Sequence, residues 1–229
     1  MKSVIVFAML VLVISGMNQC TTSEPEFCDS AVKYRIFEHD WNLAGYQIQF
    51  YEKGSGAVAA FGVKSITDDS NIVVEVSGQD YNDTIIVLSL GESLELVTQD
   101  GIETYSLLIE DIAPYNGDGA VDLAIRSTSC SVKNRLFEAD GELIGYHLQF
   151  YELDHGVVGA FGVRSVENKT ELTVEASGAC YDDTVMAMKL GETLHLVTSD
   201  ESQAYAILID EISFMANDSI IDVCVTPML

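Results

Sequence analysis

The sequence has few basic residues. It contains 11 lysines and arginines against 36 aspartates and glutamates, which gives a formal net charge of −25. A surface of this charge repels nucleic acid, so nucleic acid is excluded as a partner, and it favours cations or a cation-rich envelope. Solubility and mutual repulsion of monomers are the alternative reason for this charge. Apolar residues still make up 48% of the chain, which is too many for a disordered protein.

Catalytic and transition-metal motifs are also missing. The four histidines form no HExxH or HxH pattern, and the chain has neither a G-x-S-x-G motif nor a glycine-rich phosphate loop. Paired carboxylates are uninformative in so acidic a chain. We therefore expect a protein that is not an enzyme, with catalysis as the weakest alternative, and no organic cofactor.

Only one long apolar run is present, and it lies near the N-terminus. Lys2 precedes the run Val4–Ile14, and this arrangement is typical of a secretory signal peptide. A membrane-spanning helix needs about twenty apolar residues, so we expect no stable membrane insertion. We interpret 1–22 as a signal peptide and expect a secreted, extracellular protein of the cell-surface envelope. Lipidation of Cys20 is the alternative, although residues 17–19 suit it poorly.

The rest of the chain is a duplication. Residues 43–65 read LAGYQIQFYEKGSGAVAAFGVKS, and residues 143–165 read LIGYHLQFYELDHGVVGAFGVRS. The alignment continues without a gap on both sides, and roughly two positions in five are identical. We therefore expect two homologous tandem domains, repeat 1 at 28–127 and repeat 2 at 128–229.

Alternating apolar and polar residues predict β-strands almost throughout each copy. Eight short strands within about 95 residues are typical of an antiparallel β-sandwich, with a closed barrel as the alternative. The expected fold is therefore all-β: two tandem antiparallel β-sandwich domains of about eight strands each, after an N-terminal signal peptide. Asp140-Gly141 and Gly191-Glu192 predict tight hairpins. In the second copy the predicted strands are 133–139, 143–153, 157–166, 170–177, 184–190, 193–198, 204–212 and 219–226.

One oxygen-rich loop is a candidate calcium site. Asn116, Asp118 and Asp122 lie among glycines, and carboxylate and amide oxygens are the ligands that calcium prefers. The spacing lacks the full D-x-D-x-D-G pattern and its terminal glutamate. A solvated acidic loop is therefore the alternative.

Three N-x-[ST] sequons predict glycosylation. They fall in or beside expected loops of an exported chain, where a glycan would not disturb the core. The three asparagines are Asn82, Asn168 and Asn217.

The later half of each copy has a common order of motifs. The second copy runs GACYDDTVMAMKLGETLHL, YAILIDEIS and NDSIIDVCV, and the first runs GQDYNDTIIVLSLGESLEL, YSLLIEDIA and GDGAVDLAI. This order resembles the duplicated β-sandwich domain of methanogen surface-layer and sheath proteins. The stretch 41–46, WNLAGY, is similar to the strand that opens those domains, although Gly141 replaces the tryptophan in the second copy. The resemblance implies tandem sandwiches, export, an acidic surface, self-assembly into a cell-covering lattice or sheath, and no catalytic residues.

We expect a secreted structural protein that self-assembles into a cell-envelope layer, sheath or filament. Its partners would be copies of itself, with divalent cations as candidate bridging ions. Repeated modules provide nearly equivalent interfaces, which a lattice or a helical polymer uses. An extracellular binding module for a cation, a carbohydrate or a protein is the alternative, and its site would lie in loops at one end of the sandwich.

Four cysteines follow the signal peptide, and an oxidising compartment favours their pairing. Cys180 and Cys224 both belong to the second copy, so they predict a disulfide peculiar to that domain, with two independent surface thiols as the alternative. Cys28 and Cys130 occupy nearly equivalent points of tandem domains, which would lie too far apart for a bridge. We therefore predict a bond from Cys28 to the Cys130 of a neighbouring chain. A bond within one chain would require side-by-side sandwiches.

Overall fold

The computed structural model describes residues 26–37, 48–113, 119–138, 148–215 and 218–228, which form sixteen strands and no helix. Copy one provides β1 (Val32–Phe37), β2 (Ile48–Glu52), β3 (Gly56–Ile66), β4 (Asn71–Ser77), β5 (Thr84–Ser89), β6 (Ser93–Val97), β7 (Thr104–Ala113) and β8 (Ala120–Ser127). Copy two provides β9 (Val132–Glu138), β10 (Leu148–Glu152), β11 (Gly156–Asn168), β12 (Glu171–Gly178), β13 (Tyr181–Lys189), β14 (Thr193–Val197), β15 (Ala204–Met215) and β16 (Asp218–Met228). The predicted all-β class, with eight antiparallel strands per copy, is confirmed. The expected signal peptide lies outside the described residues.

Period-two burial explains why these segments form strands. In β4, Ile72, Val74 and Val76 are fully buried, while the residues between them are half-buried. Successive side chains of a strand point to opposite faces, so one face enters the core and the other remains near solvent. Full burial of each such aliphatic side chain contributes about 1.5–3 kcal/mol. In the described part of the chain, no helix is long and apolar enough to cross a membrane.

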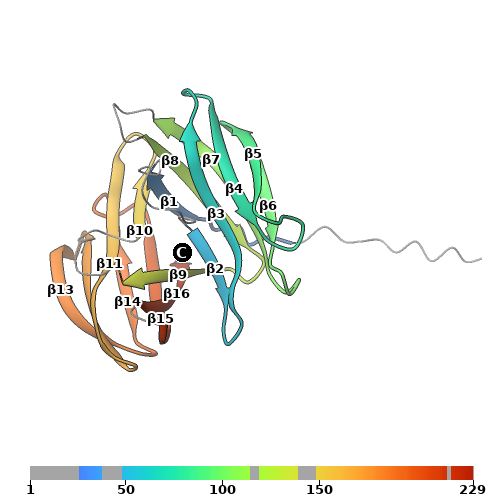
Figure 1. Cartoon of the computed structure of the whole chain (residues 1–229). Coiled ribbons are helices and arrows are strands. Elements are labelled where there is room, and N and C mark those ends of the chain that lie inside the picture. The colour runs from blue at the N-terminus through green and yellow to red at the C-terminus, as the bar shows by residue number, and fades with distance from the viewer. Residues whose placement is uncertain (1–25, 38–47, 114–118, 139–147, 216–217, 229) are drawn as a thin grey trace, which may run out of the picture.

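Each of the two sheets contains strands of both copies. Sheet A has the order β13-β12-β11-β10-β1-β8-β7-β6, and sheet B has the order β14-β15-β16-β9-β2-β3-β4-β5. The copies meet where β1 pairs with β10 and where β2 pairs with β9, both antiparallel. Figure 1 shows these four strands between the outer strands of copy one and those of copy two. The two sandwiches therefore lie side by side and are joined into two continuous sheets.

This junction between the copies has pseudo-two-fold symmetry. Tyr34 is paired with Phe150, and Phe50 is paired with Asn134. Exchanging the copies, by adding or subtracting 100, converts the first pair into the second. The junction is therefore an isologous interface built within one chain.

Aromatic side chains fill the core on both sides of the junction. Phe50 stacks on Tyr105 with ring centroids 4.1 Å apart, and Phe150 stacks on Tyr205 at 4.4 Å. Tyr34 of copy one contacts Phe150 of copy two at 5.5 Å, so one cluster spans both copies. Such ring pairs contribute about 0.5–1.5 kcal/mol beyond the area that they bury.

The expected hairpins do not form, because the flanking strands lie in different sheets. β13 belongs to sheet A and β14 to sheet B, so Gly191-Glu192 joins the two sheets. A turn does occur there: Gly191 has a φ of 82° and its N–H donates to the Ile209 carbonyl at 2.8 Å. β9 and β10 likewise lie in different sheets, so the strands that flank Asp140-Gly141 do not pair with each other. That dipeptide itself lies outside the described residues.

The cysteines form neither of the two predicted disulfide bonds. Cys28 and Cys130 form a disulfide within the chain, with their Cα atoms 5.2 Å apart. The predicted bond to a neighbouring chain is wrong, because side-by-side packing brings the starts of the two copies together. Cys180 is exposed and Cys224 is half-buried, and both are free thiols. The predicted bond between them is wrong, because Cys180 follows β12 in sheet A whereas Cys224 lies on β16 in sheet B.

Replacing both Cys28 and Cys130 with serine should lower the free energy of unfolding by about 4–5 kcal/mol. The bond spans a sequence separation of 102, and closing a loop of about a hundred residues removes that much entropy from the unfolded chain. Chemical denaturation measures the difference. The double substitution Cys180→Ser/Cys224→Ser is the control and should unfold like the wild type. A non-reducing gel showing a cross-linked ladder would contradict this assignment.

Candidate functional site: the junction and the outer sheet edges

The predicted calcium ligands are not brought together in the described residues. Asp122 lies on β8, is 2% exposed, and bonds Arg35 through both carboxylate oxygens. Its charge is therefore used by an ion pair of the sheet. Asn116 and Asp118 lie outside the described residues. No group of three or more metal-binding side chains occurs among the described residues, and the calcium site stays a prediction.

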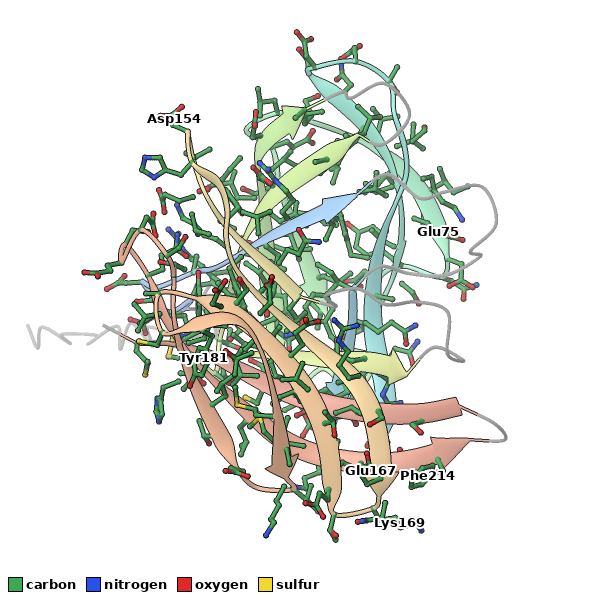
Figure 2. All side chains as sticks on the ribbon, turned by 90° about the vertical axis from the view of Figure 1, so that its left-hand side faces the viewer. Glu75, Asp154, Glu167, Lys169, Tyr181 and Phe214 are labelled. Atoms are coloured by element: carbon green, nitrogen blue, oxygen red, sulfur yellow. A yellow bond between two sulfur atoms is a disulfide. The ribbon has the colours of Figure 1, made fainter. Side chains whose placement is uncertain are left out.

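Two of the three predicted glycosylation sites are exposed. Asn82 precedes β5, and Asn168 is the last residue of β11. Figure 2 shows Glu167 and Lys169, on either side of Asn168, at the tip of the β11–β12 hairpin. The Asn168 side-chain oxygen accepts hydrogen bonds from the backbone N–H and the hydroxyl of Thr170, at 2.8 and 2.6 Å. Asn217 lies outside the described residues.

Copy two has an open hollow of about 660 Å³ beside β11 and β12. Its lining includes Ala179, Ser199 and the exposed thiol of Cys180. Copy one has the longer side chains of Gln79 and Gln99 at the positions of Ala179 and Ser199. The hollow therefore lies where the second copy carries smaller residues.

Two buried ion pairs stabilise the strands next to the junction. Arg35 on β1 contacts Asp122 on β8 with two hydrogen bonds of 2.7 Å, and Arg135 on β9 contacts Asp222 on β16 at 2.8 and 2.7 Å. Burial raises the pKa of both aspartates, and hydrogen bonding to the arginines opposes that shift. The hydrogen bond to Asp222 raises the pKa of Arg135. Each buried charge is thus neutralised by a bidentate partner.

Two tyrosines connect the copies. Tyr51 on β2 donates to Asp210 on β15 at 3.0 Å, and Tyr151 on β10 donates to Glu110 on β7. Burial raises the pKa of both phenols far above the usual value, and the carboxylates raise it further, so both hydroxyls remain donors. Strict alternation places Tyr151 on the face of β10 opposite Phe150, outside the core cluster. It is still fully buried, because Lys33 lies 5.7 Å from its ring centroid and Glu110 accepts the hydrogen bond of its hydroxyl on that face.

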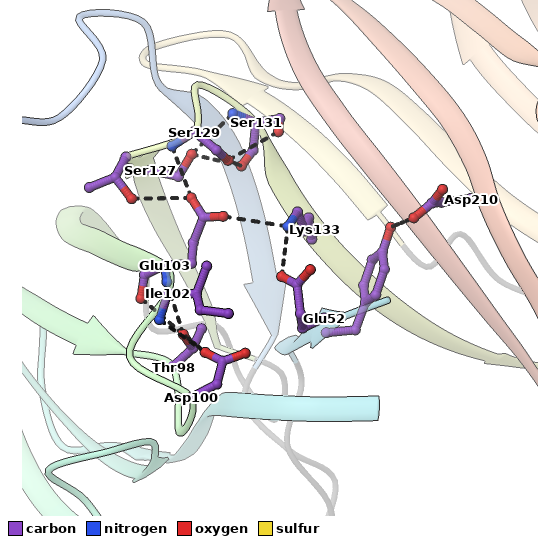
Figure 3. Close-up of polar contacts among 12 residues, drawn as sticks. Glu52, Thr98, Asp100, Ile102, Glu103, Ser127, Ser129, Ser131, Lys133 and Asp210 are labelled. Carbon is purple, nitrogen blue, oxygen red and sulfur yellow. Dashed lines mark hydrogen bonds and ion pairs between the residues drawn. The ribbon is translucent and has the colours of Figure 1, made fainter. Parts of the chain in front are cut away.

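Lysines complete the network across the junction, and Figure 3 shows Lys133 with Glu52 and Glu103. The Nζ atom of Lys133 lies 2.8 Å from Glu52 of copy one and 3.5 Å from Glu103. Lys33 lies 3.6 Å from Glu152 of copy two, the equivalent of Glu52, and 3.7 Å from Glu110 of its own copy. Burial lowers the pKa of Lys133, but the hydrogen bond and charge of Glu52 reverse the shift, and the net pKa is raised. These contacts hold the two copies in one fixed orientation.

The outer edges of the sheets are the candidate assembly surfaces. β5 and β6 end the two sheets on the copy-one side, and β13 and β14 end them on the copy-two side. Figure 1 shows the two pairs at opposite ends of the molecule. Ile85 and Val87 on β5 are 62% and 61% exposed, and Val185 on β13 is 57% exposed. An exposed strand edge with aliphatic side chains is a surface on which another strand can pair.

Sequence reasoning missed the charged residues of the junction. The signal was the recurrence of scarce basic residues at equivalent positions of the two copies, Lys33 with Lys133 and Arg35 with Arg135. Their carboxylate partners gave no such signal, because the chain contains 36 acidic residues and recurring acidic positions are common in it.

Comparison with known proteins identifies no relative. No protein-family model matches the chain, and searches of the curated proteins and of the solved structures find no match. The resemblance to methanogen surface-layer domains therefore stays a prediction.

Replacing Arg135 with alanine should lower the free energy of unfolding by about 3–5 kcal/mol, because it leaves the Asp222 carboxylate buried without a partner. Urea denaturation measures the loss. Lys64→Ala is the matched control, since Lys64 pairs with Glu75 but is 39% exposed, and it should cost about 1 kcal/mol or less. Replacing Arg135 and Asp222 together with methionine and leucine should restore most of the stability. Equal losses for Arg135→Ala and Lys64→Ala would contradict the buried-pair interpretation.

Proposed function

We propose that the protein is a secreted structural protein that self-assembles into a cell-envelope layer, sheath or filament. One observation supports this proposal above the others: equivalent unpaired sheet edges lie at the two opposite ends of one continuous two-sheet body. A subunit with equivalent surfaces at opposite ends can join a further copy at each end. Contacts at both ends that do not close into a ring produce a filament or an open array.

The junction supports the proposal because it fixes the spacing between the two ends. β1–β10 and β2–β9 pairing, the hydrogen bonds of Tyr51 and Tyr151, and the contacts of Lys33 with Glu152 and of Lys133 with Glu52 all resist movement of one copy against the other. A subunit of constant shape is what a regular lattice requires. The disulfide between Cys28 and Cys130 also supports the proposal, since such bonds persist in oxidising, extracytoplasmic compartments.

The charge of the chain sets the conditions for assembly. Subunits of net charge −25 repel one another over distances near the Debye length, about 8 Å at physiological ionic strength. Screening by salt or bridging by divalent cations is therefore needed before most of the acidic surface can pack against a neighbour.

Assembly should weaken when divalent cations are removed or ionic strength is lowered. Light scattering of concentrated protein, with and without chelator across a salt series, measures this dependence, and electron microscopy shows whether the assemblies are regular. A monodisperse monomer under all salt and calcium conditions would rule out the proposed function. Regular assemblies indifferent to salt and chelator would leave strand pairing, rather than cations, as the main contact.

An extracellular binding module is the second candidate, and the hollow of copy two favours it. The hollow is large enough for a small ligand, and copy two has small residues there. The substitutions Ala179→Gln and Ser199→Gln introduce the residues of copy one and should fill it. If a panel of carbohydrates binds the wild type but not this double variant, and no assembly forms, the binding module is the better interpretation. Binding unaffected by the variant would exclude the hollow as its site.

A further inference from the structure

The four outer strands differ in charge. β5 has the sequence TIIVLS and contains no charged residue. β6 carries the exposed Glu95, and β13 carries Asp182, Asp183 and Lys189, whereas β14, with the sequence TLHLV, contains no acidic residue, lysine or arginine. Natural proteins usually protect a sheet edge with charged side chains, because these oppose pairing with another strand. Among the outer strands of the described sheets, β5 and β14 lack such protection, and of these two it is β5 that exposes large aliphatic side chains.

The outer face of β5 is also apolar. Ile85 and Val87 point away from the core and are the two most exposed side chains of any outer strand among the described large hydrophobic residues. Val87 is paired with Val73 of β4, which continues the apolar surface onto the next strand. The residue beside Ile85 is Glu75, whose charge is neutralised by Lys64. This face is therefore apolar and locally neutral in a strongly acidic molecule.

We infer that β5 is a dimerisation strand, which pairs antiparallel with β5 of a second copy and so extends sheet B from one molecule into the next. The inference rests on the proposed self-assembly, and it identifies the first contact that forms between two subunits. A register centred on Ile86 places Ile85 opposite the partner's Val87 on the outer face. Cross-strand aliphatic pairs of this kind stabilise a sheet. The same type of contact already joins the two copies within the chain, at β1–β10 and β2–β9.

The charge of the chain explains why the partner is a second copy. Two molecules of net charge −25 can approach closely only where neither presents charge, and β5 satisfies this condition on both sides. In the register centred on Ile86, Asp83 lies opposite the partner's Ser89 and not opposite the partner's Asp83. A basic partner, by contrast, would find no carboxylate on β5 to bind.

This dimer divides assembly into two steps with different ionic requirements. Pairing through a charge-free strand should persist in chelator. The dimer then presents the copy-two edges at its outer ends, and β13 there is charged. Further growth through those edges should require screening or bridging cations.

Analytical ultracentrifugation in chelator, at about 0.15 M ionic strength, tests the dimer directly. The wild type should sediment as a dimer. The double variant Ile85→Glu/Val87→Glu should raise the dimer Kd about a hundredfold or more, because like charges then face each other across the interface. Val185→Glu/Ala187→Glu places the same substitutions on the equivalent edge of copy two and is the matched control, which should remain dimeric. Circular dichroism and urea denaturation check that both variants fold.

Cross-linking tests the register. In a Cys180→Ser/Cys224→Ser background, mixing an Ile85→Cys variant with a Val87→Cys variant should give a disulfide-linked heterodimer on oxidation. Mixing Ile85→Cys with Glu95→Cys, on β6, should give none, and an equal yield from both mixtures would overturn the β5 register.

The outcomes separate this inference from the proposed function. A wild type that is monomeric in chelator yet forms regular arrays with cations overturns the β5 dimer and leaves the function standing. A dimer that Ile85→Glu/Val87→Glu abolishes, without arrays under any condition, supports the dimer and removes the function. A dimer that only Val185→Glu/Ala187→Glu abolishes overturns the inference and assigns the contact to copy two.

Discussion

Strand pairing between the copies is the contact on which the rest of the structure depends. Taken alone, each copy consists of two four-stranded half-sheets that end at β1 and β2 or at β9 and β10. Their backbone groups would be unpaired, and the side chains of Phe50 and Phe150, now fully buried, would lie at an open edge. Pairing β1 with β10 and β2 with β9 supplies the missing backbone hydrogen bonds and also covers the two phenylalanine side chains. The ion pairs, the tyrosine contacts and the disulfide are arranged around these two pairings.

The symmetry of the junction is broken where its two halves meet. Tyr34 and Asn134 occupy equivalent positions, and the Asn134 side-chain amide donates to the Tyr34 hydroxyl at 2.9 Å. Two residues that meet on a pseudo-two-fold axis need not be identical, and here an amide donor faces a hydroxyl acceptor. Two tyrosines would place a second ring in the same space. The duplication therefore allowed a contact that a true homodimer of one copy could not make.

The sequence predicts the strands closely but not their partners. The predicted strand 193–198 agrees with β14, Thr193–Val197, and the duplication predicts eight strands in each copy. Periodicity reports which residues of a strand face the core, but it holds no information on which strand lies alongside. The hairpin at Gly191-Glu192 and both disulfide predictions failed for this reason. The junction lysines and arginines were visible as recurring positions, but their roles depend on pairing between distant strands.

The disulfide between Cys28 and Cys130 has a mechanical consequence. It joins the beginning of copy one to the beginning of copy two, across a sequence separation of 102. A pulling force applied between the two chain ends would pass through this covalent bond directly into copy two. Copy one would lie in a closed loop outside the line of force and would carry load only through its contacts with copy two. Under such a force, copy one would thus be shielded from unfolding.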